Sequence, residues 1–255
     1  MFFATKETVP EGVGFSTFGI THLIWLVSLG LIGVVWVLLY RRLNYHRRNI
    51  MRTALGILIV SLEIVKDIVA VIMGNFDAGQ LPFHLCGINI LLILFDLFWQ
   101  TKTVRNFLYY FCIPGALLAL LFPNWTVLPC MNFSHIHSFV VHALLVIYPI
   151  MLVLDGEIKT GIKEMLKGIL LLVCMAIPIY FINLILDTSF MFLMNPETGN
   201  PLGLFEKYLG SHLWGFPVLL PIVMFIMYIP LLIISKCKKN TTNETENKEK
   251  QEATL

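Results

Sequence analysis

The stretch of residues 18–42, FGITHLIWLVSLGLIGVVWVLLYRR, decides the fold class of this chain. From Phe18 to Tyr40 it contains no Asp, Glu, Lys or Arg, and it then ends on Arg41 and Arg42. A helix rises about 1.5 Å per residue, so about 20 apolar residues cross the roughly 30 Å hydrocarbon core of a membrane. The stretch therefore predicts a transmembrane helix that ends on charged residues at the membrane surface.

Six further apolar runs follow, at about residues 53–74, 84–99, 104–122, 136–154, 165–186 and 213–235. Of the 255 residues 57% are apolar and 13% are charged, and the mean hydropathy is +0.79. A soluble domain carries about 25% charged residues, so water-soluble enzymes and nucleic-acid-binding proteins are excluded. Lipid cannot satisfy unpaired backbone groups, so the runs must be helices. The sequence predicts an all-α polytopic membrane helix bundle with seven transmembrane helices.

Basic residues lie in every second connection between the predicted helices. They are Arg41, Arg42, Arg47, Arg48 and Arg52, then Lys102 and Arg105, then Lys159, Lys163 and Lys167, and finally Lys236, Lys238 and Lys239. The alternate connections hold only Lys6 and Lys207. Because cytoplasmic loops carry the excess of Lys and Arg, the N-terminus is predicted outside and the C-terminus in the cytoplasm. The expected location is the cell (plasma) membrane.

The same map divides the chain into three parts. Residues 1–17 form an extracellular N-terminal segment, residues 18–235 the transmembrane domain, and residues 236–255 a cytoplasmic tail. The tail is rich in Asn, Thr, Glu and Lys and almost free of apolar residues, so it is predicted to be disordered. Trp99, Trp125 and Trp214 fall at predicted interfaces, where an amphipathic ring is stable.

Polar residues gather at the outer ends of the predicted helices. Six of the seven histidines lie at or just below the outer surface, with His46 on the inner side. Polar side chains are costly in a membrane and usually face the bundle interior, so we expect a single outward-facing pocket. The candidate residues are His22, His84, Cys86, Asn89, His142, Asn183 and His212. His135 and His137 lie near a loop and fit an interfacial role best.

Cys86 and His142 have the chemistry of a nucleophile and its base. A thiol needs a base or a positive charge nearby to act at neutral pH, and His142 or His84 could supply it. A direct pair of His84 with Cys86 requires the helix to begin between them, because residues two apart on a helix do not face each other. Two structural alternatives are open: Cys86 is a buried small hydrophobic residue, or it is disulfide-bonded to Cys130.

A second polar group lies deeper in the membrane. Glu63, Lys66 and Asp67 are spaced i, i+3 and i+4, so Glu63 and Lys66 can pair on one helix face. Glu63 falls near the midplane, and Asp96 on the next helix reaches a similar depth. The group is either a proton or ion relay, or a charge-neutralised cluster that holds the second helix against the third.

Several motifs spread over the chain point to one family. They are GITHL at 19–23, LPFHLC at 81–86, GAL at 115–117 leading to Phe122 and Pro123, His142, and Asn183 followed by TSFMFL at 188–193 and Pro196. Together they resemble the YwaF-like family of bacterial integral membrane proteins, which is related to the animal transmembrane protein 164. The resemblance spans nearly the whole chain except the tail.

The resemblance carries an expected activity. The animal relative is regarded as a lipid acyltransferase that moves a fatty acyl chain between phospholipids through a cysteine and a histidine. The resemblance implies that Cys86 is the acyl acceptor and His142 the general base. It further implies that His84 and His22 are supporting groups and that Asn183 donates to the tetrahedral oxyanion.

We therefore expect a lipid acyltransferase or transacylase that acts on phospholipid acyl chains at the outer leaflet. The expected catalytic residues are Cys86, His142 and His84. The expected substrate-binding residues are His22, Asn89, Asn183 and His212. No cofactor, no metal and no nucleic-acid partner are expected; the expected partners are membrane phospholipids, and the oligomeric state is open.

Two other classes stand as alternatives. A metal-dependent membrane hydrolase would bind its ion through His22, His84, Cys86 and His142, since imidazole and thiolate are good zinc ligands. A non-enzymatic lipid or small-molecule transporter or sensor would instead use the deeper charged group.

Overall fold

The computed structural model describes residues 1–159, 161–196 and 201–252, with the backbone alone from 235 to 252. Within these residues the chain contains helices and no strand, and a helix lies at each of the seven predicted apolar runs. The main helices are α1 (Ile20–Arg42), α2 (Tyr45–Ile72), α3 (Leu85–Phe98), α4 (Lys102–Phe107), α5 (Ile113–Leu121), α6 (Phe133–Leu154), α7 (Ile162–Leu186), α8 (Leu202–Leu209) and α9 (Gly215–Glu252). The prediction of an all-α fold is confirmed.

Short helical turns complete the chain. Three tight turns, η1 (Ala78–Gln80), η3 (Phe190–Phe192) and η4 (His212–Trp214), lie in the connections. A widened π-helical turn, η2 (Leu108–Cys112), joins α4 to α5 into one continuous segment, just before Pro114. Proline has no N–H to donate, and the wider turn accommodates that missing bond.

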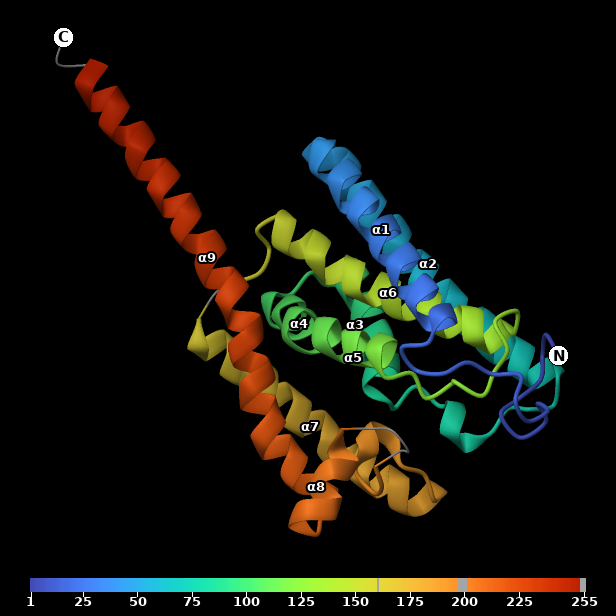
Figure 1. Ribbon diagram of the computed structural model, residues 1–255. Coiled ribbons are helices and arrows are strands. Elements are labelled where there is room, and N and C mark those ends of the chain that lie inside the picture. Colours follow the sequence, from blue (N-terminus) through green and yellow to red (C-terminus); the bar gives the residue numbers. More distant parts are fainter. Residues whose placement is uncertain (160, 197–200, 253–255) are drawn as a thin grey trace.

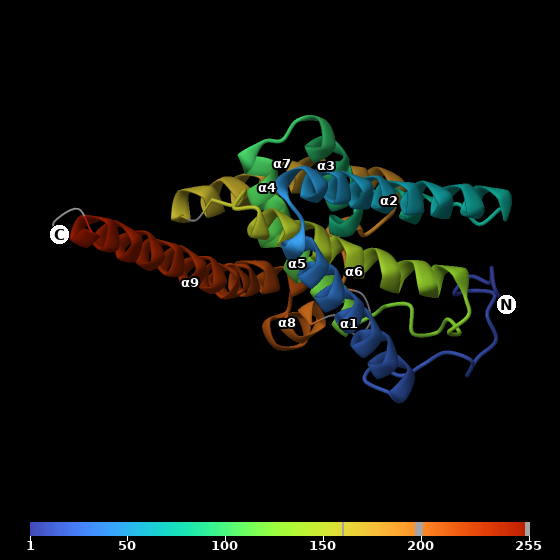
Figure 2. The same ribbon diagram turned by 90° about the horizontal axis from the view of Figure 1, so that it is seen from above.

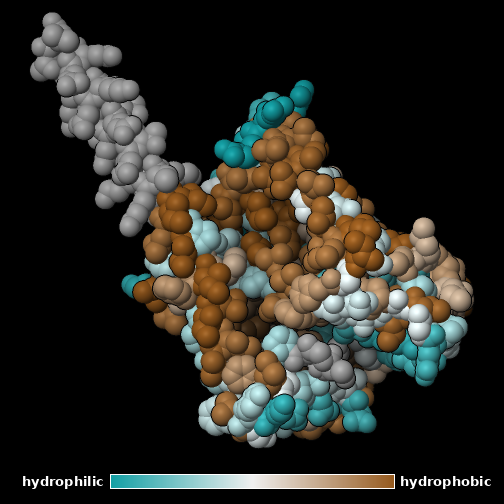
Figure 3. Space-filling model, viewed as in Figure 1, coloured by the Kyte–Doolittle hydropathy of each residue, from teal (hydrophilic) through white to brown (hydrophobic). Residues whose placement is uncertain are grey.

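Helix α6 lies at the centre of the bundle. Helices α1, α2 and α5 all pack against it, and α7 packs against α4 (Figures 1 and 2). Half of the α6 span and two-thirds of the α4–α5 span are buried, against 6% for α1 and 11% each for α7 and α9. The peripheral helices therefore turn apolar side chains outward, and Figure 3 shows this apolar face hollowed between α9 and α1. Lipid is the environment in which such a surface is stable.

Five helices among the described residues are long and apolar enough to cross a membrane: α1, the α4–α5 segment, α6, α7 and the segment from His212 to Ile234. Helix α2 is also long enough, but it carries Glu63, Lys66 and Asp67 within its apolar part. Helix α3 is apolar but has only 14 residues. A multi-pass membrane protein is thus confirmed, and the number of seven spans stays a prediction.

The C-terminal helix extends past its apolar part. The backbone of α9 is helical up to Glu252, so it continues through most of the tail for which the composition predicts disorder. Residues 253–255 of that tail lie outside the described residues.

Buried ion pairs join the helices at the predicted inner side. Asp155, at the end of α6, accepts a hydrogen bond from the Tyr40 hydroxyl of α1 and one of 3.0 Å from Arg52 of α2. The Arg52 and Asp155 side chains are only 5% and 3% exposed. A similar cluster lies nearby, where Asp96 binds Arg105 at 2.8 Å and Tyr148 at 2.9 Å. Each buried charge is therefore matched by an opposite charge.

Replacing Asp155 by alanine is expected to destabilise the fold strongly, because the buried Arg52 guanidinium then lacks its carboxylate. Removing one partner of a buried pair costs about 3–5 kcal/mol. The measurement is denaturant or thermal unfolding in detergent. The control is Lys167→Ala, which breaks an exposed pair with Glu164 and should move the unfolding midpoint little. Equal effects of the two substitutions would show that Asp155 does not hold the bundle together.

Candidate functional site

Cys86 lies in the first turn of α3. The helix begins at Leu85, with His84 as its extended N-cap residue, so the predicted helix start between His84 and Cys86 is confirmed. The N-cap side chain makes no capping hydrogen bond to this end. A Cβ atom on Gly87 would lie 2.8 Å from Cα of Pro82, so the preceding turn packs closely over the helix start. Unpaired backbone N–H groups at a helix start favour a negative charge placed there.

The Cys86 side chain faces the interior of the bundle. It is half-buried and contacts the main core, to which Val141 and Leu145 of α6 belong. The charges of Glu63 and Lys66 on α2 act on it. Cys86 and Cys130 are both free thiols, so the disulfide alternative is wrong. Cys86 is therefore a free thiol on which the charge of a partly buried carboxylate acts.

His142 presents one ring nitrogen as an acceptor. Its Nδ1 lies 2.7 Å from the carbonyl oxygen of Ser138, one turn back on α6. A carbonyl oxygen only accepts, so Nδ1 carries the hydrogen and, in the neutral ring, Nε2 holds the lone pair. The ring stacks on Trp125, with centroids 5.5 Å apart and planes inclined by 20°. The charge of Glu63 acts on His142 as it does on Cys86.

The charge of Glu63 acts on both candidate catalytic residues, and the sequence pattern did not predict Glu63 in this site. Its carboxylate pairs with Lys66, and His137 Nε2 of α6 lies 3.6 Å from it. The His137 side chain is 8% exposed and belongs to α6, so it packs inside the bundle; its position at the membrane interface stays a prediction. Asp96, predicted to share this cluster, pairs instead with Arg105 and Tyr148. The structure therefore divides the predicted charged group into two.

Asn89 lies one turn after Cys86 on α3, three residues along the helix and so on the same face. It is 1% exposed, and its Oδ1 atom has no hydrogen-bond partner among the described residues. A buried amide usually has its hydrogen bonds satisfied, and an unmet one costs about 1–3 kcal/mol. The position beside the thiol and the unused oxygen mark Asn89 as a polar group available to a ligand.

Three other predicted residues meet at the turn η3. The Asn183 side chain donates to the Phe190 carbonyl at 3.1 Å and accepts from the Phe190 N–H at 2.8 Å. His212 Nε2 donates to the Phe192 carbonyl at 3.0 Å, and the His84 ring contacts the Phe190 ring edge-on at 5.1 Å. Asn183 thus uses its amide on the backbone of this turn.

The backbone of η3 needs these anchors. Met191 and Phe192 both adopt positive φ angles, 56° and 57°, which are strained for residues with a side chain. Such a conformation persists only where the surroundings hold it. The hydrogen bonds from Asn183 and His212 do so, and they keep the turn against the His84 side of α3.

His22 lies apart from this group, at the start of α1. It is fully buried; its Nδ1 accepts from the Phe18 N–H at 2.9 Å and its Nε2 donates to the Leu120 carbonyl at 2.7 Å. Both ring nitrogens are therefore used to join the start of α1 to the end of α5. In the described part of the chain, no group of three or more His, Cys, Asp or Glu side chains is placed to hold a metal ion.

Parts of this site were absent from the sequence prediction. Trp125, predicted at the interface, is 5% exposed and forms the wall behind His142. Glu63 was grouped with other charges by spacing along its own helix. The i, i+4 spacing of His137, Val141 and Leu145 on α6 was the available signal that His137 shares a face with the core.

The outer helices expose apolar side chains, and the buried charges inside the bundle are paired. These are the features of a multi-pass integral membrane protein. A family model described as the TMEM164 family matches residues 17–228, which is most of the chain. The chain belongs to the TMEM164 family. The relation to transmembrane protein 164 expected from the motifs is confirmed. No curated protein matches the chain, and no solved structure matches it.

Proposed function

We propose that the chain crosses the plasma membrane seven times, with its N-terminus outside. The basic connections support this orientation. The arrangement in Figure 1 supports it too: the N-terminus and the connections before α3 and α8 lie towards the lower right. The connection between α1 and α2 lies at the top of the view, and the end of α9 lies at the upper left. Helix α2 is counted as the sixth span because its charged side chains pair with one another. Helix α3 is counted as the seventh because the turn that precedes it adds to its length.

We propose further that the protein is a cysteine-dependent transacylase acting on phospholipid acyl chains at the outer leaflet. The observation that carries this proposal is that the charge of one partly buried carboxylate, Glu63 of α2, acts on both Cys86 of α3 and His142 of α6. This is the arrangement of a nucleophile, a base and a third group that steadies the base. Glu63 stabilises the imidazolium that forms when His142 takes a proton.

In the first half-reaction, His142 Nε2 takes the proton of the Cys86 thiol, and the thiolate attacks the ester carbonyl of the donor lipid. A C–S bond forms and the carbonyl electrons move onto oxygen. When the tetrahedral intermediate collapses, the ester C–O bond breaks and the leaving alkoxide takes the proton from the imidazolium. The products are a lysolipid and a thioester on Cys86.

The second half-reaction reverses these steps with a different alcohol. The hydroxyl of an acceptor lysolipid gives its proton to His142 and attacks the thioester carbonyl. The C–S bond then breaks and the thiolate takes the proton back. In both halves the backbone N–H groups at the start of α3 stabilise the oxyanion. Asn89 Oδ1 accepts a hydrogen bond from an O–H or N–H group of the bound lipid. His84 borders the lipid entry together with the turn that Asn183 and His212 hold.

Replacing Asn89 by leucine is expected to lower the transfer rate about tenfold, because the bound lipid loses one hydrogen bond, which is worth about 0.5–1.5 kcal/mol. Because its Oδ1 atom has no partner, the substitution should leave the free energy of unfolding unchanged or raise it. The measurements are turnover of a labelled phospholipid and unfolding in detergent. The comparison is Asn183→Leu, which removes two backbone hydrogen bonds and should lower stability. Unchanged turnover in the Asn89 variant would contradict its role.

The proposal is tested by the intact mass of the purified protein after incubation with phospholipid vesicles. The expected result is an increase equal to one fatty acyl group, removed by hydroxylamine and located on the peptide that contains Cys86. An adduct elsewhere, or no adduct in a folded protein, would refute the cysteine mechanism. In that case a transporter or sensor built on Glu63 and Lys66 is favoured, and Glu63→Gln should then abolish function.

A further inference from the structure

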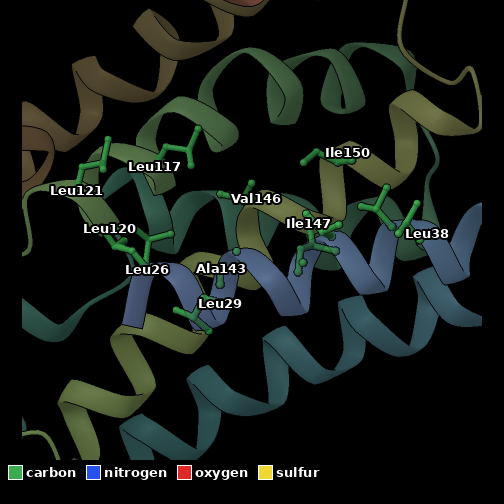
Figure 4. A pocket seen from close by; sticks show the side chains of 14 residues that line it. Leu26, Leu29, Leu38, Leu117, Leu120, Leu121, Ala143, Val146, Ile147 and Ile150 are labelled. Carbon is green, nitrogen blue, oxygen red and sulfur yellow. The ribbon is translucent and has the colours of Figure 1, made fainter. Parts of the chain in front are cut away.

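An apolar crevice runs along the membrane-facing side of the bundle. Helices α1 and α5 each pack on α6, and the crevice lies between them with α6 as its floor. Along α1 it extends from Leu26 to Leu38, and on α6 from Ala143 to Ile150 (Figure 4). All of its lining residues are Leu, Ile, Val, Ala or Gly. No polar side chain interrupts its walls, so its occupant must be apolar.

The dimensions of the crevice select its occupant. The twelve residue steps from Leu26 to Leu38 correspond to about 18 Å along the helix, slightly more than half of the roughly 30 Å hydrocarbon core. Its volume is about 440 Å³. A helix is at least about 10 Å across, so 18 Å of helix needs about 1,400 Å³. The crevice is therefore too small to enclose a transmembrane helix and suits one extended hydrocarbon chain that spans one leaflet.

We propose that this crevice binds a single fatty acyl chain of a membrane phospholipid. Its outer end begins at Ala143, next in sequence to His142, so a chain lying in it brings its ester end to the level of the imidazole. The binding of the chain follows from the crevice alone. Its contribution to transfer rests on the proposed function.

Two glycines of α1 create the space. A Cβ atom on Gly30 would meet no atom within 4 Å, and one on Gly33 would approach Ile147 only to 3.7 Å. Both glycines line the crevice. A larger side chain at Gly30 therefore fills the crevice without a clash, and loss of glycine from a helix interior is itself stabilising. Gly30→Trp and Gly30→Leu are blocking variants that should fold.

The test uses vesicles containing phosphatidylcholine with a photoactivatable group on one acyl chain. In the wild type, cross-links are expected to concentrate on peptides of α1, α5 and α6 that line the crevice. Gly30→Trp should reduce this labelling about tenfold, and Gly30→Leu should reduce it less. Leu31→Trp adds the same ring on the adjacent residue, which is 63% exposed and outside the crevice, and should leave labelling unchanged.

Labelling that spreads equally over α7 and α9, or that Gly30→Trp does not reduce, would overturn the proposal. So would cross-links between two copies of the chain through this face of α1. The same experiment on Cys86→Ala separates the two proposals. Crevice labelling that persists in this variant is expected, because acyl-chain binding does not need the thiol, whether or not the protein transfers acyl groups.

Discussion

Cys86→Ala is expected to lower acyl transfer between phospholipids by at least about 10³-fold, because the variant has no atom to carry the acyl group. Cys86→Ser should be almost as inactive, since a hydroxyl is a weaker nucleophile than a thiol under the same base. Neither variant should show the acyl mass adduct. Turnover of a fluorescent phospholipid in proteoliposomes measures the rate, and the intact mass measures the adduct.

The other cysteines supply matched controls. Cys174 on α7 and Cys130 before α6 are both free and exposed. Cys174→Ala and Cys130→Ala should transfer acyl groups at the wild-type rate. Folding of each variant is checked by its elution volume and helical content in detergent. Retained transfer by Cys86→Ala, or loss in Cys174→Ala, would assign the chemistry to another group.

The positions of the helices could be predicted from the sequence because lipid imposes a simple rule. A span needs a long apolar run, and its ends are marked by charged or capping residues. The predicted run 136–154 became α6 from Phe133, since Asn132 caps the helix and its side chain accepts from the N–H groups of Ser134 and His135. The first turn of this helix contains the polar residues Ser134 and His135, so a prediction based on apolar residues alone places the helix start a few residues too late.

The side-chain partners could not be predicted in the same way. A span such as α1 is apolar on all sides, so no periodicity tells which face meets a neighbour. The sequence therefore grouped His22 with Cys86 by depth alone, although His22 bonds the end of α5. It likewise could not show that Asn183 is used by the Phe190 backbone, or that Glu63 faces α6. The depth of a residue in the membrane can be predicted from its position in the sequence. The direction in which its side chain points depends on how the helices pack.

His142→Ala is expected to slow acyl-adduct formation about 10²–10⁴-fold, the usual contribution of a positioned general base. The reason lies in the tautomer: Ser138 accepts from Nδ1, so Nε2 is the nitrogen that takes the thiol proton. In the variant, hydroxide from solution must take that proton, so the residual rate should rise more steeply with pH than in the wild type. Adduct formation followed by mass at several pH values measures both effects.

His142→Gln and His46→Ala serve as comparisons. Glutamine keeps a polar side chain under Trp125 but is no base, so it should be as slow as alanine if proton transfer is the role of His142. His46 is exposed at the start of α2 on the opposite side of the bundle, and its removal should leave the rate unchanged. A His142→Gln protein with the wild-type rate and pH profile would reduce His142 to a packing residue. The base would then be sought in His137, because its Nε2 also faces Glu63.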